Sequence, residues 1–430
     1  MAELIGAFSR ALDIALGHTD GHTLRSCVLG MKLAECVGLN SAQQRNLYYS
    51  LLLKDLGITG DFVRGMRYGG FAGSEPALAW SYGKEVLPKR RILPVLADLL
   101  LQRETKLPFR QIVRRVFASQ SQTGDFLRNN RMLAFHRTIN AGFSRDVADT
   151  VAYIDTRWDG RGLPLTRRAS VSLQSQLVKM AQTLESLYEV YGANLALDII
   201  YRRCKGWFDP GVIAAAMITF RLPESWEDLE RPNLLSYVAR LEPEDGDPET
   251  APENIDGICE IFADLIDSFT HNKTRHSHRV MRLALQIGSR MGLPQEKLTT
   301  IRRAALMHDL GCMGVECSSG ELQRDMAKTQ RLALEWLSSV QGFEEVATTV
   351  AMHGEYLDGS GAPFGLRGDE IALCARVLAV AEASILISEQ SDDVTPPDFD
   401  ALAHELEETM QGKLDVVCLR ALQDVSRIQV

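Results

Sequence analysis

The chain has 430 residues, of which 45% are hydrophobic and 24% are charged. These proportions are close to globular averages and exclude wholesale disorder. The net charge of −9 argues against a general nucleic-acid binder. No apolar stretch reaches the roughly 18 residues of a membrane helix, and the first residues lack a signal-peptide pattern. Eight cysteines without a CxxC pair favour reduced thiols. We therefore expect a cytoplasmic protein with no membrane association.

Apolar residues recur with helical spacing along the chain. Between Leu24 and Ala34 they fall on one face at offsets 0, 3, 4, 7 and 10, and between Val280 and Met291 at offsets 0, 3, 4, 7 and 11. Alternating patterns typical of strands are scarce. The sequence therefore predicts an all-α fold.

Motifs that recur in the same order indicate two copies of one helical domain. His22 lies 32 residues before Lys54 in LLLKDLG, and His276 lies 32 residues before His308 in ALMHDLG. The first histidine of each pair begins an amphipathic segment that ends in Gly-Leu. Two later motifs also match, RWDGRGLP at 157–164 and EYLDGSGAP at 355–363.

The domain boundaries follow from these offsets and from composition. The copies are 254 residues apart at the histidines but 199 apart at the DGxG motifs, so the first copy carries about 55 extra residues. Residues 242–256 hold seven acidic residues, three prolines and no basic residue, as expected of a solvated linker. We predict a first domain at 1–220 with a basic insertion at about 60–125, an acidic linker at 221–255 and a second domain at 256–430.

The strongest chemical signal is the adjacent pair His308-Asp309. A neutral imidazole and a carboxylate oxygen can bind the same divalent cation, and the carboxylate can bridge two. His276 on the preceding predicted helix and Glu382 on a later one complete a candidate ligand set. His353 would add a donor from a loop.

At these residues the second copy resembles the HD superfamily of metal-dependent phosphohydrolases, and within it the HD-GYP subfamily. The first copy resembles the same family more faintly, which implies two tandem HD-type helical domains. Known members are bacterial and cleave cyclic dinucleotides, chiefly cyclic di-GMP, with two or three iron or manganese ions. The motifs that carry the resemblance are HSHRV (276–280) for the family's HSxRV, AALMHDLG (304–311) for AALLHDIG, HGEYLDGSGAPFGLRGDEI (353–371) for HHExxDGxGYPxGLxGxxI, and RVLAVAE (376–382) for RILAVAD.

The resemblance implies a depleted metal site. The family's minimal one-metal set is kept, with Glu382 in place of the usual aspartate. We therefore expect one divalent ion, iron or manganese, or none, and a water-filled cavity where a second ion would bind. Four family positions are changed: the lysine of HDxGK to Cys312, a later histidine ligand to Thr329, the second histidine of HHE to Gly354 and the tyrosine of GYP to Ala362.

The resemblance also suggests roles around the metal. We assign catalytic roles to Asp309, which could orient the attacking water, and to His353. Arg279 or Arg367 could hold a phosphate. Gly359 and Gly361 of the DGSG loop are placed on the substrate side. His271 and His278 are expected to face solvent.

The first copy lacks most of these donors. It keeps His22 and Asp55, but Lys54 replaces the partner histidine and offers no lone pair while protonated. Ile154 and Gln182 replace two further ligands. We expect a degenerate domain that packs on its twin or regulates it.

Two functions remain open. In the first, this is a bacterial signalling phosphohydrolase that acts on a cyclic dinucleotide or another nucleotide phosphate. In the second, it is a catalytically inactive protein that acts by binding a ligand or a protein signalling partner. A nucleic-acid-binding regulator is disfavoured, because no helix-turn-helix segment follows either copy.

Overall fold

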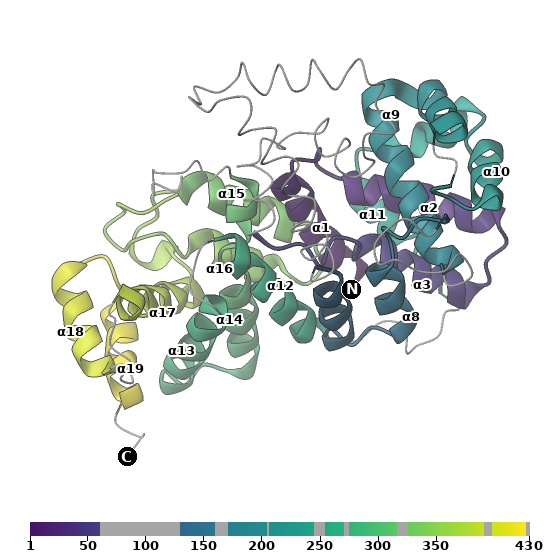
Figure 1. Cartoon of the computed structure of the whole chain (residues 1–430). Coiled ribbons are helices and arrows are strands. Elements are labelled where there is room, and N and C mark those ends of the chain that lie inside the picture. Colours follow the sequence, from purple (N-terminus) through teal and green to yellow (C-terminus); the bar gives the residue numbers. More distant parts are fainter. Residues whose placement is uncertain are drawn as a thin grey trace, which may run out of the picture. The chain divides into compact units, whose positions relative to one another are not determined.

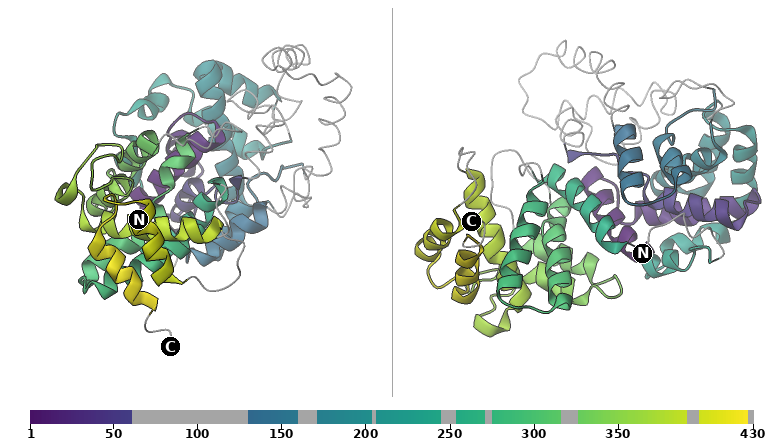
Figure 2. Two further views of the ribbon diagram at one scale, coloured as in Figure 1. Left: turned by 90° about the vertical axis from the view of Figure 1, so that its left-hand side faces the viewer. Right: turned by 90° about the horizontal axis from the view of Figure 1, so that it is seen from below.

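The structure is a computed structural model, and its described residues form two compact units, Met1–Asn254 and Ile255–Val430 (Figures 1 and 2). These residues are helical and contain no β-strand, which confirms the all-α prediction. No described helix combines the length and apolarity needed to cross a membrane. The basic insertion predicted at about 60–125 lies, apart from its first residue, outside the described part. The described ranges are 1–60, 130–159, 171–203, 206–244, 254–270, 275–315, 326–390 and 398–426.

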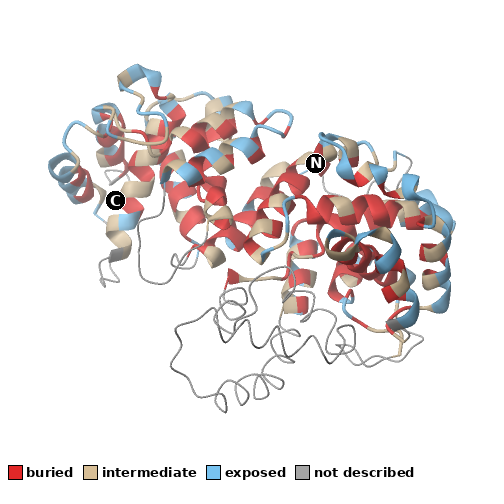
Figure 3. Cartoon of the chain, turned by 90° about the horizontal axis from the view of Figure 1, so that it is seen from above, coloured by how far each residue is buried: buried red, intermediate tan, exposed pale blue. Residues whose placement is uncertain are grey.

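The first unit is built around one central helix, α2, which packs against α1, α3 and α9. The apolar face predicted between Leu24 and Ala34 is buried, as the red segments of Figure 3 illustrate for both units. Polar caps fix the ends of its neighbours: Asn40 and Gln43 form a capping box at α3, and Ser144 caps α8. The helices of this unit are α1 (Ala2–Leu16), α2 (His22–Cys36), α3 (Ser41–Leu52), a helix through 130–140, α8 (Arg145–Ala152), α9 (Leu173–Arg203), α10 (Pro210–Thr219), η3 (Pro223–Glu230) and α11 (Leu234–Ala239).

Part of the segment predicted as an acidic linker at 221–255 is folded. Residues 223–230 form η3 and residues 234–239 form α11, and both helices pack against α2. Trp226 and Val238 are buried there. The expectation was too wide because residues 221–241, although partly acidic, also carry apolar side chains that can be buried.

The second unit repeats the same packing around α13, which contacts α12, α14 and α17. In both units the first helix packs on the central one, the third on the central one and on a short later helix, and the long helix after the DGxG motif on the central one. The helices here are α12 (Ile255–Phe269), α13 (His276–Arg290), α14 (Gln295–Met307), η5 (Leu310–Gly314), α15 (Met326–Leu337), α16 (Glu344–Met352), η6 (Gly368–Glu370), α17 (Leu373–Gln390), α18 (Phe399–Thr409) and α19 (Val416–Ser426).

The two central helices also begin in the same way. Each starts after a residue in the left-handed conformation, Gly21 before α2 and Arg275 before α13, and neither has a capping side chain of its own. Instead, a buried aspartate of the preceding helix accepts from the second residue of the central helix, through its backbone N–H and its hydroxyl. The pairs are Asp13 with Thr23 and Asp267 with Ser277.

Candidate metal centre

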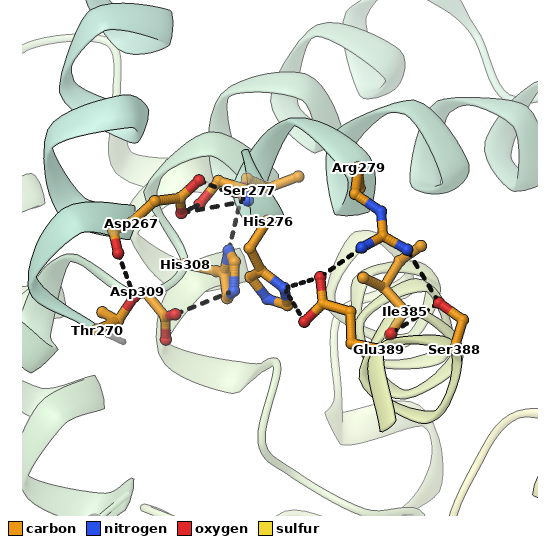
Figure 4. Close-up of polar contacts among 11 residues, drawn as sticks. Asp267, Thr270, His276, Ser277, Arg279, His308, Asp309, Ile385, Ser388 and Glu389 are labelled. Carbon is orange, nitrogen blue, oxygen red and sulfur yellow. Dashed lines mark hydrogen bonds and ion pairs between the residues drawn. The ribbon is translucent and has the colours of Figure 1, made fainter. Parts of the chain in front are cut away.

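Three of the predicted metal ligands come together at the start of α13 and the end of α14. His276 is the first residue of α13, His308 ends α14, and Asp309 follows it directly. Their donor atoms lie within 4.8 Å of one another, and all three residues are buried. Figure 4 shows the three side chains turned toward a common point. Two helix ends thus place two imidazoles and one carboxylate around a space suited to a cation.

The histidines are held so that their Nε2 atoms remain available. His308 donates from Nδ1 to the carbonyl oxygen of Ala305 at 2.7 Å. Because a carbonyl oxygen only accepts, Nδ1 carries the proton and Nε2 keeps its lone pair. That Nε2 is buried, makes no hydrogen bond among the described residues and lies 3.6 Å from a carboxylate oxygen of Asp309. A buried nitrogen beside a carboxylate is a suitable donor for a metal ion.

His276 is oriented by a residue that the sequence analysis did not identify. Its Nδ1 lies 3.2 Å from both carboxylate oxygens of Glu389 on α17. A carboxylate behind a histidine fixes the ring and raises the basicity of the other nitrogen, as in many metal sites. This pairing could not be predicted from the sequence, because Glu389 lies 113 residues from His276 along the chain.

The local electrostatics favour a cation. Burial lowers the pKa of His308, but the carboxylates of Asp309 and Glu382 outweigh it, so the pKa lies above its ordinary value. Carboxylates that favour positive charge on a buried imidazole also favour a metal ion at the same place. The donor set and the charge therefore both fit a divalent cation.

His353 and Glu382 lie beside this group. His353, at the end of α16, donates from Nδ1 to the carbonyl oxygen of Val350, and its ring centroid is 5.6 Å from that of His308. Its Nε2 lies 3.4 Å from a carboxylate oxygen of Glu382. Glu382 is thus paired with His353 and is not part of the three-residue group.

Arg279 is paired within the second unit. Its guanidinium donates to Glu389 at 2.7 Å and to the hydroxyl of Ser388 at 3.1 Å. It therefore supports the carboxylate that orients His276. Its assignment as a phosphate ligand remains a prediction.

The DGSG loop is shaped by a buried glutamate. Glu355 accepts from the backbone N–H of Phe364 at 2.6 Å and of Leu366 at 3.0 Å. Gly359 has a φ of 79°, and a side chain at Gly361 would collide with the backbone of Glu355. Both glycines are thus required by the turn itself. Arg367 is exposed in this loop.

The expected cavity lined by Thr329, Gly354 and Cys312 is partly filled. The buried side chain of Gln330 lies against Gly354, where a Cβ would meet its amide. In the orientation that satisfies both ends, this amide donates to the carbonyl oxygen of Ala362 and accepts from the N–H of Gly354. The Cys312 thiol lies 3.5 Å from a carboxylate oxygen of Asp309.

One histidine was placed wrongly by the sequence. His278 does not face solvent: it is buried on α13, with Nε2 3.1 Å from a carboxylate oxygen of Asp264. It points away from the metal ligands because two residues along a helix turn the side chain by about 200°. His271 lies outside the described residues.

Comparison with known proteins identifies the second unit. Residues 260–384 match the family of the HD domain. This unit therefore belongs to the HD superfamily, and the resemblance to the HD-GYP subfamily drawn from its motifs is confirmed.

Two relatives and one solved structure illustrate the relationship. The chain is 25% identical to the 3'3'-cGAMP-specific phosphodiesterase 3 of Vibrio cholerae, in an alignment that covers 98% of this chain and 94% of that protein. It is 36% identical to the cyclic di-GMP phosphodiesterase response regulator RpfG of Xanthomonas campestris over 24% of this chain and 30% of that one. A crystal structure of a V. cholerae cyclic GMP-AMP-specific phosphodiesterase covers 100% of this chain and 98% of its own, with a TM-score of 0.65 and 21% identity. The fold is thus shared over the whole length.

Proposed function

We propose that the second unit is a metal-dependent phosphodiesterase that hydrolyses a cyclic dinucleotide, with 3'3'-cGAMP as the substrate to test first. The observation that carries the proposal is the group His276, His308 and Asp309, in which Nδ1 of each histidine is held by an outer partner. The substrate class is supported by the names of the relatives that match the chain.

The metal would be iron or manganese, held by His276, His308 and Asp309, with Glu382 as the remaining ligand. When bound, such an ion lowers the pKa of a water and offsets charge on the phosphoryl oxygens. The second carboxylate oxygen of Asp309 can accept a proton from the attacking water. His353, whose Nε2 lies 3.4 Å from a carboxylate oxygen of Glu382, could supply the proton for the leaving oxygen.

The inactive alternative has less support. It drew on the substitutions at 312, 329, 354 and 362 and on the degenerate first copy, none of which removes His276, His308 or Asp309. Three donors of the one-ion group lie within 4.8 Å of one another, and both histidines have outer partners. A single ion stabilises the attacking and leaving oxygens less well than a pair does. We therefore expect slow turnover.

The test is hydrolysis by the full-length chain loaded with Mn²⁺ or Fe²⁺. The substrates are 3'3'-cGAMP, cyclic di-GMP and a nucleotide monoester, with products separated by chromatography. His308→Ala should lower the rate by more than about 100-fold, since loss of an outer partner alone costs 10- to 100-fold. His278→Gln is the matched control on α13 and should retain activity. Hydrolysis that survives His308→Ala, or its absence from the loaded wild type, would refute the proposal.

A further inference from the structure

The first unit contains a buried cluster of ionisable side chains at the position that the metal ligands occupy in the second. Lys54 has a fully buried side chain and its ammonium is paired with Asp55. His22 and Glu185 are also buried, and Nδ1 of His22 is bonded to the carboxylate of Glu185. The ring of His18 stacks on His22 with centroids 4.1 Å apart.

The contacts of this cluster resemble those of the second unit, although the glutamates come from neighbouring helix turns: Glu185 lies three residues after Gln182, and Glu389 lies seven after Glu382. His22 begins α2 as His276 begins α13, and each donates from Nδ1 to a glutamate of the long helix after the DGxG motif. The arginine three residues later bonds the same glutamate in both units: Arg25 to Glu185 and Arg279 to Glu389. The clear difference is Lys54, which stands where the second unit has His308.

We infer that the ammonium of Lys54 is a built-in cation that fills the place of a metal ion in the first unit. On this view the first unit kept the buried carboxylates of a metal site, and the Lys54 ammonium balances their negative charge. The unit then needs no metal to fold, and its carboxylates are not left unpaired. This inference does not depend on the second unit being an active enzyme.

The charges around Lys54 support this role. Burial raises the pKa of Asp55, but the ammonium of Lys54 overrides it and holds the pKa below its ordinary value. Burial first, and then the charge of Lys54, push the pKa of His22 well below its usual range. The imidazole is therefore neutral, and its buried Nε2 has no hydrogen-bond partner among the described residues. One internal cation is thus paired with the Asp55 carboxylate, and its charge also acts on the neutral imidazole of His22.

A metal could not replace the lysine without further donors. The second unit has His353 and Glu382 beside its metal group, whereas the matching positions in the first are Ile154 and Gln182. Ile154 is buried and offers no ligand atom.

The experiment is a double-mutant cycle in the full-length chain, read by hydrogen exchange of peptides from α2 and α9. Lys54→Met removes the charge at similar length and leaves Asp55 buried without its partner. Exchange in these peptides should then be faster by about 100-fold or more, the effect of breaking a buried ion pair. Asp55→Asn alone should also speed exchange. The double variant should be better protected than Lys54→Met, because both charges are gone.

Two controls separate this role from general packing. Lys32→Met removes a partly exposed lysine of the same unit, paired with Asp228, and should change exchange little. A chelator should leave exchange in α2 and α9 of the wild type unchanged. The inference is overturned if Lys54→Met keeps wild-type protection, if the double variant is no better than Lys54→Met, or if the chelator deprotects the first unit.

Discussion

At the scale of single residues, the metal site depends on side chains that never touch the ion. Glu389 holds Nδ1 of His276 and is itself bonded by Arg279. Without it the imidazole could rotate or change tautomer, and a well-placed donor would be lost.

We therefore predict that Glu389→Ala weakens Mn²⁺ binding by about 10- to 100-fold. The affinity is measured by calorimetric titration of metal-free protein. Glu345→Ala removes a half-exposed carboxylate of the same unit, paired with Lys297, and should leave the affinity unchanged. Equal affinities for the two variants would show that His276 is not held for metal binding.

A second prediction at this scale concerns Gln330. Its buried amide occupies the space beside Gly354 and bonds the backbone there. Gly354→Ala should cost about 1–3 kcal/mol, because the added methyl overpacks this contact. In a Gln330→Ala background the same change should cost clearly less, as measured by urea denaturation. A cost that is the same in both backgrounds would contradict this account of the site.

At the scale of helices, the central helix of each unit is capped at its N-terminus by an aspartate of the preceding helix. In the first unit this cap is Asp13, whose pKa burial raises from 3.8 to about 8, although Lys54 and hydrogen bonds from Thr23 act in the opposite direction and the nearby Asp55 raises it further. The folded state therefore keeps a proton on Asp13 that the unfolded chain releases near pH 4.

This shift predicts a pH dependence with a definite sign. Between about pH 4 and pH 8 the folded state binds the extra proton, so Asp13 makes the first unit less stable as the pH rises, by up to about 1.4 kcal/mol per pH unit. Asp13→Asn should remove this contribution and flatten the curve. Thermal denaturation of both proteins from pH 5 to pH 8 measures it. Parallel curves would mean that Asp13 is already ionised in the fold.

The helices also show what sequence could and could not predict. The long amphipathic segments became α2 and α13, because one apolar face repeated over three turns leaves little choice. The aspartate caps were invisible, since Asp13 and Thr23 are ten residues apart and meet only through the turn between helices. The pair His308-Asp309 could be identified because its two residues are adjacent in the sequence. The role of Glu389 could not, because its position beside His276 depends on how α17 is rotated about its axis.

At the scale of the whole molecule, the two units share one helical fold but differ in the group that lies beside their buried carboxylates. The first unit has an internal ammonium in Lys54, whereas the second has the donor group His276, His308 and Asp309. The two units should therefore respond differently to metal.

We predict about one divalent ion per chain, measured by elemental analysis of protein purified without chelator. Any ligand that binds only the folded state stabilises it, by about 2.7 kcal/mol at a concentration 100 times its Kd. Chelation should thus speed hydrogen exchange in α13 and α14 by about 100-fold at such a loading, while α2 and α9 keep their protection. Two ions per chain would mean that His353, Glu382 and Cys312 hold a second ion with Asp309 despite Gln330. No bound ion, even after incubation with Mn²⁺ or Fe²⁺, would favour a binding protein over an enzyme. Chelator effects of equal size in both units would show that the lysine has not replaced a metal.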